Sequence, residues 1–187
     1  MKTFMFMDIE ATGLRWRQDV VLEVAWAFTD EHFEVLGEPR SFVVKPEDHE
    51  WATIASQLRK NDIPRQMHQS SGLYDELPMA EHDILDIRKV MRADIEEQLQ
   101  VGAAIHLAGL SVEFDRTFLD ELHDFEFEEM GVHHRLYNLS AVKLALDNVG
   151  VVYYSAKPGN HRALADVFEA IEQARIFREL LGHLPAV

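Results

Sequence analysis

The first third of the chain carries the apolar patterns of β-strands. Residues 3–10 (TFMFMDIE) are a run of mostly bulky apolar side chains that ends at the turn 11–14. Residues 20–30 (VVLEVAWAFTD) are apolar on both faces apart from Glu23, which is typical of a strand in the middle of a sheet. Residues 33–46 predict two extended pieces around a Gly and Pro turn. Since no helix fits between these segments, they predict an antiparallel meander.

The rest of the chain alternates helical spacing with short apolar runs. In chain order, the pattern predicts short helices and loops at 47–78, a helix at 80–99, a strand at 103–110, a helix at 114–125, a strand at 135–140 and helices at 141–150 and 161–182. The two last helices end at glycines. The apolar stripe of the final helix consists of Leu164, Val167, Phe168, Ile171, Phe177 and Leu180. The order of elements predicts the α/β class, with one mixed five-stranded sheet, antiparallel in its first three strands and flanked by helices.

Length and composition are those of a soluble globular protein. The 187 residues fit a single domain over 1–187, with 47% hydrophobic and 27% charged residues and no repeat or low-complexity tract. The chain has no cysteine, which excludes disulfides and thiolate metal sites. No secretory signal or membrane-spanning run is visible. We therefore expect a cytoplasmic protein that does not associate with membranes.

The formal net charge is −15. Proteins that coat long nucleic acids use Lys and Arg to displace counterions from phosphates, so this charge argues against that class. It does not exclude an enzyme that holds a few phosphates locally through metal ions. A negative surface that serves only solubility is the other interpretation.

Four carboxylates stand at the ends of predicted elements. Asp8 and Glu10 share one face of the first strand, because strand side chains alternate with period 2. Asp115 opens a helix after a strand, and Asp166 lies in the first turns of the last helix. Each of these two could simply complement a helix dipole. Together, the four oxygen donors predict a site for two divalent cations, Mg²⁺ or Mn²⁺, about 4 Å apart.

The spacing between His161 and Asp166 predicts that His161 precedes the last helix. His161 lies five residues before Asp166, so the two would not share one face of a continuous helix. The preceding residues 155–160 (SAKPGN) predict a mobile loop. A neutral imidazole on such a loop can take a proton from an attacking water.

Three segments with these residues resemble the exonuclease motifs of the DEDDh superfamily. They are DIEATGL at 8–14, FDRTFL at 114–119 and HRALAD at 161–166, in the superfamily's order. The resemblance implies an RNase H-like fold, two metal ions and 3′-to-5′ removal of nucleoside monophosphates. The catalytic positions that it implies are Asp8, Glu10, Asp115, His161 and Asp166.

Within the superfamily, nearly the whole chain is most similar to the oligoribonuclease family. The similarity is carried by 8–30, by HQSSGL at 68–73 and by HHRLYNLSAVKLA at 133–145. It implies short single-stranded RNA as the substrate. It also implies a homodimer in which residues 133–145 cap the partner's site.

The resemblance further implies a set of substrate contacts. Leu14 would wedge between bases, within a turn in which Ala11 and Thr12 also touch the last bases. His68, Ser111 and Arg135 would hold the terminal phosphate, with Arg135 acting on the partner's substrate, and His134 would lie beside it.

The residues alone leave other interpretations of these positions. Leu14 after a glycine is often core packing, and a histidine such as His68 in a polar segment is often solvated. Arg135 follows the acidic run 120–130, where a salt bridge competes with phosphate binding. Arginine nevertheless binds phosphate bidentately better than other side chains.

The chain departs from the oligoribonuclease pattern at three positions. Leu110 stands in place of an asparagine, Ile63 in place of an aromatic residue and His134 in place of a tyrosine. All three departures fall on substrate contacts and none on a metal ligand. They leave open the length cutoff and the preference for RNA over DNA.

Three hypotheses follow for the function. The first is a metal-dependent 3′-to-5′ exonuclease of short single-stranded oligonucleotides, with RNA preferred. The second is a DNA-directed DEDDh exonuclease of the proofreading or ribonuclease T type, which would lack a preference for the 2′-hydroxyl. The third is an RNase H-like binding module without chemistry, against which the five catalytic positions argue.

Overall fold

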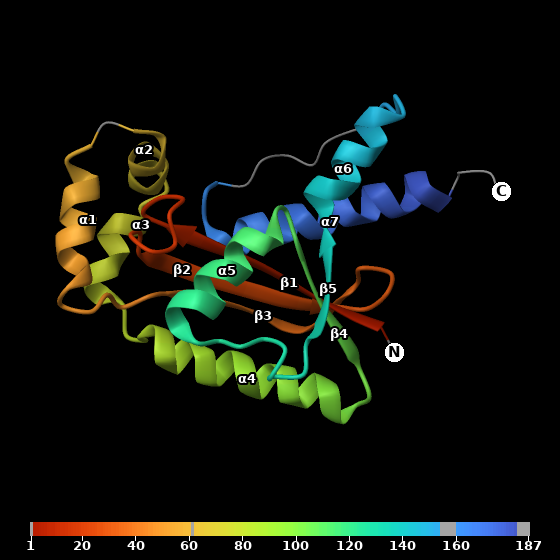
Figure 1. Ribbon diagram of the computed structural model, residues 1–187, viewed down its shortest axis with the longest axis horizontal. Helices are drawn as coiled ribbons and strands as arrows, with labels where there is room; N and C mark the ends of the chain where they lie inside the picture. Colours follow the sequence, from red (N-terminus) through yellow and green to blue (C-terminus); the bar gives the residue numbers. More distant parts are fainter. Residues whose placement is uncertain (1, 61, 154–159, 183–187) are drawn as a thin grey trace.

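A five-stranded mixed sheet forms the centre of the computed structural model, which describes residues 2–60, 62–153 and 160–182 (Figure 1). The strand order is β3-β2-β1-β4-β5. β1, β2 and β3 pair antiparallel, whereas β4 pairs parallel to β1 and β5 parallel to β4. The strands are β1 Lys2–Ala11, β2 Val21–Thr29, β3 Val35–Val43, β4 Ala104–Gly109 and β5 His133–Asn138. The predicted sheet, including its antiparallel first three strands, is confirmed.

The prediction of two extended pieces after β2 is wrong, because β3 is one strand. Its pairing with β2 is irregular: Arg40 lies opposite Trp26, but Leu36 lies opposite Phe28. The extra residues of β3 include Gly37, whose φ of 69° is accessible to glycine. A Gly and Pro pair therefore produces a bulge here rather than a turn.

Helices cover both faces of the sheet (Figure 1). They are α1 Glu50–Leu58, α2 Ile63–Ser70, α3 Leu73–Glu76, the 3₁₀ turn η1 Leu77–Met79, α4 Ile84–Gln100, α5 Val112–His123, α6 Leu139–Asn148 and α7 Ala163–Gly182. α4 begins four residues later than the apolar pattern predicts. The reason is Asp83, whose side chain accepts a hydrogen bond from the Asp86 amide and caps the helix. Within the described ranges, no helix has the length and apolar character needed to cross a membrane.

The alternation of side chains along β1 separates two core layers. Met5, Met7 and Ile9 belong to a buried cluster with residues of α4 and α5. Phe4 and Phe6 belong to a second cluster, which contains residues of α6 and α7. Positions 8 and 10 continue the row of Phe4 and Phe6, so their side chains lie on the side of the sheet that α7 covers.

The apolar stripe of α7 differs from the prediction at one position. Phe168 is 44% exposed. It lies about 100° around the helix from Val167, at the margin of the buried face. Two alanines, Ala170 and Ala174, are buried and let α7 approach β1 and β2 closely.

Candidate catalytic site

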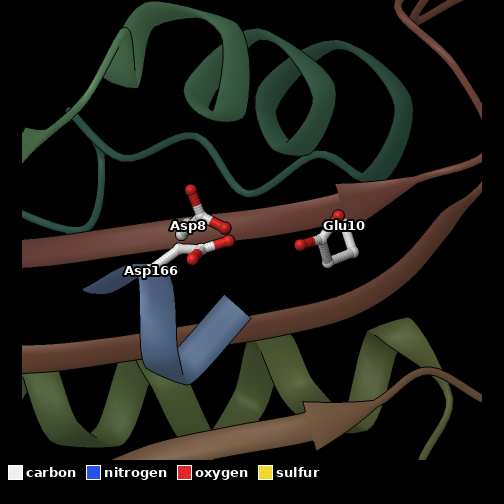
Figure 2. Close-up of side chains that lie close together, drawn as sticks. All are labelled: Asp8, Glu10 and Asp166. Carbon is white, nitrogen blue, oxygen red and sulfur yellow. The ribbon is translucent and has the colours of Figure 1, made fainter. Parts of the chain in front are cut away.

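The end of β1 carries two carboxylates on the side of the sheet that faces α7. Asp8 and Glu10 project there, and the β1–β2 register shifts immediately after Glu10. Asp166 comes from the first turn of α7. One ligand oxygen from each of the three carboxyl groups lies within 4.8 Å of the others (Figure 2). The structure thus brings together three of the four predicted carboxylates as one potential ligand set.

Asp115 reaches the end of β1 from the other side of the sheet. It is buried in the first turn of α5, and its Oδ1 accepts a hydrogen bond of 3.0 Å from the Ile9 amide. That amide is available because β4 pairs with β1 only as far as Phe6 and Ala108. The end of β4 therefore opens the place that Asp115 occupies beside Asp8 and Glu10.

Burial and neighbouring negative charges raise the pKa values of all four carboxyl groups. Burial, followed by the charges of Asp115, Asp166, Glu10 and Glu23, raises the pKa of Asp8 well above its usual range. Burial and the charges of Asp166 and Glu23 raise the pKa of Glu10 to about 8, and Glu10 shares a hydrogen bond with Asp166. Without a cation, this cluster therefore retains protons near neutral pH.

The other two carboxyl groups follow the same pattern. Burial raises the pKa of Asp115 to about 7, against the hydrogen bond from Ile9. Burial and the charge of Glu169 raise the pKa of Asp166 to about 6, against the opposing effect of His161.

The donor set fits hard divalent cations. All of its ligand atoms are carboxylate oxygens, which suit Mg²⁺ and Mn²⁺ rather than softer metals. A bound cation would also reverse the electrostatic problem, because positive charge lowers the pKa values that burial raises. The chemistry of these clustered, buried carboxylates therefore fits a divalent cation.

His161 lies beside this cluster, just before α7. It adopts a left-handed φ of 58°, which is rare for a residue with a Cβ, and its side chain is half-buried. The presence of His161 lowers the pKa of Asp166, against the larger effect of burial. The prediction that His161 precedes the helix is confirmed. Residues 154–159 of the predicted mobile loop lie outside the described residues.

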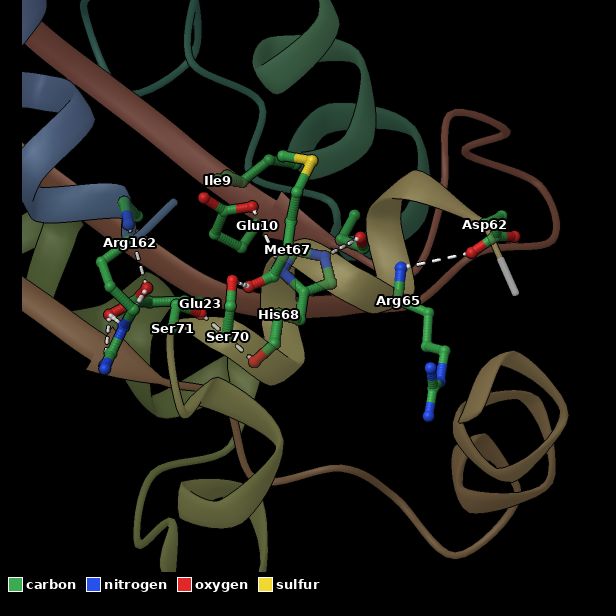
Figure 3. Close-up of polar contacts among 12 residues, drawn as sticks. Ile9, Glu10, Glu23, Asp62, Arg65, Met67, His68, Ser70, Ser71 and Arg162 are labelled. Carbon is green, nitrogen blue, oxygen red and sulfur yellow. Dashed lines mark hydrogen bonds and ion pairs between the residues drawn. The ribbon is translucent and has the colours of Figure 1, made fainter. Parts of the chain in front are cut away.

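His68 is not the solvated histidine that its polar segment suggests. It is only 2% exposed on α2, and its Nε2 lies 2.8 Å from the Ala11 carbonyl oxygen. Its Nδ1 lies 3.6 Å from Oε2 of Glu10 (Figure 3). Burial lowers the pKa of His68, so a neutral imidazole donating to Ala11 turns its other nitrogen toward Glu10. No sequence signal pointed to this contact, since positions 10 and 68 are distant in the chain.

An apolar pocket of about 430 Å³ adjoins Glu10. Leu14, Ile63 and Phe114 are among the residues that line it. Leu14 is 80% exposed, so its interpretation as core packing is wrong. Apolar side chains that remain open to solvent beside an acidic cluster are suited to contact a nucleobase.

The turn after β1 is held by Asp19. The Asp19 carboxylate accepts hydrogen bonds from the Thr12 hydroxyl and from the Arg15 amide, at 3.2 and 2.9 Å. The Thr12 oxygen in turn accepts from the Val20 amide. The Thr12 side chain is buried in this network, and the sequence analysis did not identify Asp19 as the residue that organises the turn.

The three other predicted substrate residues stand on β5 or immediately before α5, outside the set of carboxylates that converge. Ser111 is exposed immediately before α5, with its hydroxyl 2.9 Å from that of Ser140. His134 and Arg135 are exposed on β5, which is an edge strand two positions from β1 in the sheet. Arg135 forms no ion pair with any carboxylate of the described residues, so the predicted alternative of a salt bridge is not observed there.

Curated proteins with similar sequences are oligoribonucleases. The chain is 36% identical to the oligoribonuclease of Streptomyces avermitilis over 180 residues, which covers 95% of this chain and 86% of that protein. It is 36% identical to the Streptomyces griseus oligoribonuclease over 178 residues, covering 94% and 84%. The oligoribonuclease of Cutibacterium acnes is 33% identical over 186 residues, covering 95% and 85%. No family model matches the chain.

Solved structures with a similar fold are those of exonuclease I. One such structure superposes with a TM-score of 0.66 at 17% identity, covering 98% of this chain and 44% of exonuclease I. The exonuclease I of Methylocaldum szegediense gives a TM-score of 0.65 at 19% identity, covering 98% and 42%. This chain thus spans less than half the length of those proteins. The likeness establishes an RNase H-like exonuclease fold, as the sequence resemblance implied.

Proposed function

Since the chain belongs to the oligoribonuclease family of DEDDh 3′-to-5′ exoribonucleases, we propose that it hydrolyses short single-stranded oligonucleotides from the 3′ end to nucleoside 5′-monophosphates. We propose RNA as the preferred substrate. The observation that carries this proposal is the convergence of Asp8, Glu10 and Asp166, with His161 beside them. Buried carboxylates that repel one another lower stability, so their convergence supports a functional site.

The proposed roles follow from the chemistry of each side chain. Asp8, Glu10, Asp115 and Asp166 would hold two Mg²⁺ or Mn²⁺ ions. Such ions, when bound, stabilise the attacking and leaving oxygens of an in-line phosphodiester displacement. His161 would take the proton of the attacking water as general base. The hydrogen bond from the Ile9 amide holds Asp115, and the packing of α7 on the sheet holds Asp166, before substrate arrives.

Most of the proposed substrate contacts line the pocket beside Glu10 or stand on β5, whereas Thr12 lies in the turn after β1 and Ser111 immediately before α5. Leu14 and the neighbouring Ala11 and Thr12 would border the terminal bases. His68, Ser111, His134 and Arg135 would bind the terminal phosphate or lie beside it. The net charge of −15 favours short substrates, because it repels long polyanions.

We also propose a homodimer in which Arg135 acts on the partner's substrate. Its support is the exposed position of Arg135 on an edge strand, without an ion pair among the described residues. Sedimentation at micromolar concentration should give the mass of a dimer. A monomer alone would contradict the role of Arg135 across subunits. A cytoplasmic location remains a prediction that the absence of cysteine supports.

A length series of oligonucleotides tests the function. Purified protein with Mn²⁺ or Mg²⁺ should release nucleoside 5′-monophosphates from labelled di- to pentaribonucleotides, and the rate should fall for long RNA. Deoxyribonucleotides of equal length should react more slowly. Equal rates on DNA and RNA would favour the DNA-directed alternative, and no turnover with either metal would contradict the proposal.

A further inference from the structure

The side chain of Arg162 joins three elements that meet behind the carboxylate cluster. Its Nε lies 3.0 Å from Oε2 of Glu23 on β2, and its Nη2 lies 3.0 Å from Oε1 of the same carboxylate (Figure 3). On its other side, Nη1 and Nη2 donate to the two carboxylate oxygens of Glu76 at 2.7 and 2.9 Å. Glu76 is the last residue of α3. We call these three residues the Glu23–Arg162–Glu76 clamp.

Glu23 is committed to holding the start of α7. It is fully buried on β2, directly opposite Glu10 of β1. Besides the guanidinium, it accepts a hydrogen bond of 3.0 Å from the Ala163 amide, the first residue of α7. A buried carboxylate is stable only when it is paired and hydrogen-bonded, so Arg162 and Ala163 cannot leave it at low cost.

The backbone of Arg162 connects this clamp to the reacting groups. Its carbonyl oxygen accepts the Asp166 amide at 3.1 Å, and its neighbour His161 is in the left-handed conformation. A residue with a Cβ keeps such a conformation only where surrounding contacts enforce it. The bonds of the Arg162 side chain to Glu23 and Glu76, and of its carbonyl oxygen to the Asp166 amide, are contacts that can hold His161 in this conformation.

We propose that Arg162 is a positioning residue for catalysis, in which the Glu23–Arg162–Glu76 clamp holds His161 and Asp166 in their reactive arrangement. This inference rests on the proposed function, because it assigns a purpose to His161 as the base. The clamp contributes no ligand and no proton. It fixes where the imidazole stands relative to the carboxylates, and small displacements of a catalytic group slow a reaction strongly.

The test compares two clamp variants with a matched control on the same helix. Arg162→Met removes every bond of the clamp, and Glu76→Gln removes one charge from its more exposed side. Glu23 is left unchanged, because its charge also acts on the pKa of Glu10. The control is Arg175→Met, since Arg175 of α7 donates two hydrogen bonds to the Phe33 carbonyl and pairs with Glu34 far along the helix.

The measurement is kcat and KM on a short ribonucleotide, together with the melting temperature of each variant. We expect kcat to fall on the order of a hundredfold in Arg162→Met and about tenfold in Glu76→Gln, with KM within about threefold of wild type. Arg175→Met should lower the melting temperature and leave kcat within about twofold. If Arg162→Met does not fold, Glu76→Gln still decides the question, because the Glu76 side chain is 43% exposed.

The outcomes separate this inference from the proposed function. Active wild-type protein with unchanged kcat in folded Glu76→Gln and Arg162→Met would overturn the clamp's role and leave the exonuclease proposal standing. An equal loss of kcat in Arg175→Met would also overturn it, since any weakening of α7 would then suffice. Inactive wild-type protein with both metals would instead contradict the proposed function.

Discussion

Asp8 sits at the centre of the carboxylate cluster, and its surroundings explain why a strand ends in two acids. It is flanked by Glu10 on the same face, by Asp166 from α7 and by Asp115 from α5. Each of these neighbours stands on a strand or a helix rather than on a loop. The repulsion that results is a cost that a divalent cation would remove.

Substitutions at the acidic positions and at His161 test the proposed division of roles. Asp8→Asn and Asp166→Asn should reduce hydrolysis to the limit of detection, because each replaces a proposed metal ligand by a neutral amide. His161→Ala should reduce kcat by about 10²- to 10⁴-fold, the usual contribution of a general base. Glu179→Gln, an exposed change at the far end of α7, should retain activity. Full activity of Asp8→Asn would contradict the metal site.

The pKa of Glu10 predicts how the stability of the metal-free protein depends on pH. Its folded pKa of about 8 exceeds the ordinary value of 4.5, so the folded state binds the proton more tightly than the unfolded state. The stabilisation from this proton is complete below pH 4.5 and is lost as pH rises through 8. Melting temperatures in a chelator should therefore fall from pH 5 toward pH 8.

Glu10→Gln supplies the control for this pH dependence. It should flatten the fall and raise the melting temperature at pH 8, while abolishing hydrolysis. Added Mn²⁺ should stabilise wild type more than the variant, because the variant lacks one proposed ligand. Parallel pH curves for the two proteins in chelator would contradict the assigned pKa.

The site residues stand at the end of a strand and in the first turns of two helices. The sequence predicted that arrangement because period 2 places Asp8 and Glu10 on one face and because Asp115 and Asp166 open helices. It could not predict which face each helix covers, so the separate approach of Asp115 through the Ile9 amide emerged only from the sheet order. The contacts of His68 and Arg162 depend on pairs distant in sequence, for which a single sequence carries no signal.

Two predictions from local sequence patterns were wrong, because the same residues are compatible with two structures. Gly37 and Pro39 indicated a turn between two pieces, yet β3 continues through them as a bulge. Phe168 fitted a helical stripe, yet alanines fill the buried face beside it. In both cases the packing of neighbouring elements determined the outcome, and periodicity alone does not contain that information.

The β1–β2 turn offers a prediction at the scale of the element. A Cβ at Gly13 would lie 2.7 Å from the Asp19 carboxylate, closer than such contacts occur, so Gly13→Ala should displace the turn that carries Leu14. A loss of about 1 kcal/mol in substrate binding raises KM by about fivefold, and we expect a change of that size with a smaller effect on kcat. Gly182→Ala, where a Cβ meets no atom within 4 Å, is the control. Unchanged KM in Gly13→Ala would contradict a substrate role of the turn.

At the scale of the whole molecule, a mixed dimer tests whether one subunit completes the other's site. Asp8→Ala and Arg135→Ala proteins should each have little activity. After subunit exchange, a mixed dimer would hold one site with an intact Asp8 and an intact Arg135 from its partner. Random mixing should therefore restore about a quarter of wild-type activity. No recovery, despite exchange shown by mass, would place both residues in the same site, and full activity of Arg135→Ala alone would assign Arg135 no role.

The central claim is tested most directly by the products formed from one tetraribonucleotide labelled at its 5′ end, with Mn²⁺ present. We predict labelled fragments that shorten one residue at a time from the 3′ end, with nucleoside 5′-monophosphates as the released product. With Asp8→Asn, the tetraribonucleotide should stay intact. Shortening from the 5′ end, internal cleavage, or equal turnover by Asp8→Asn would contradict the account.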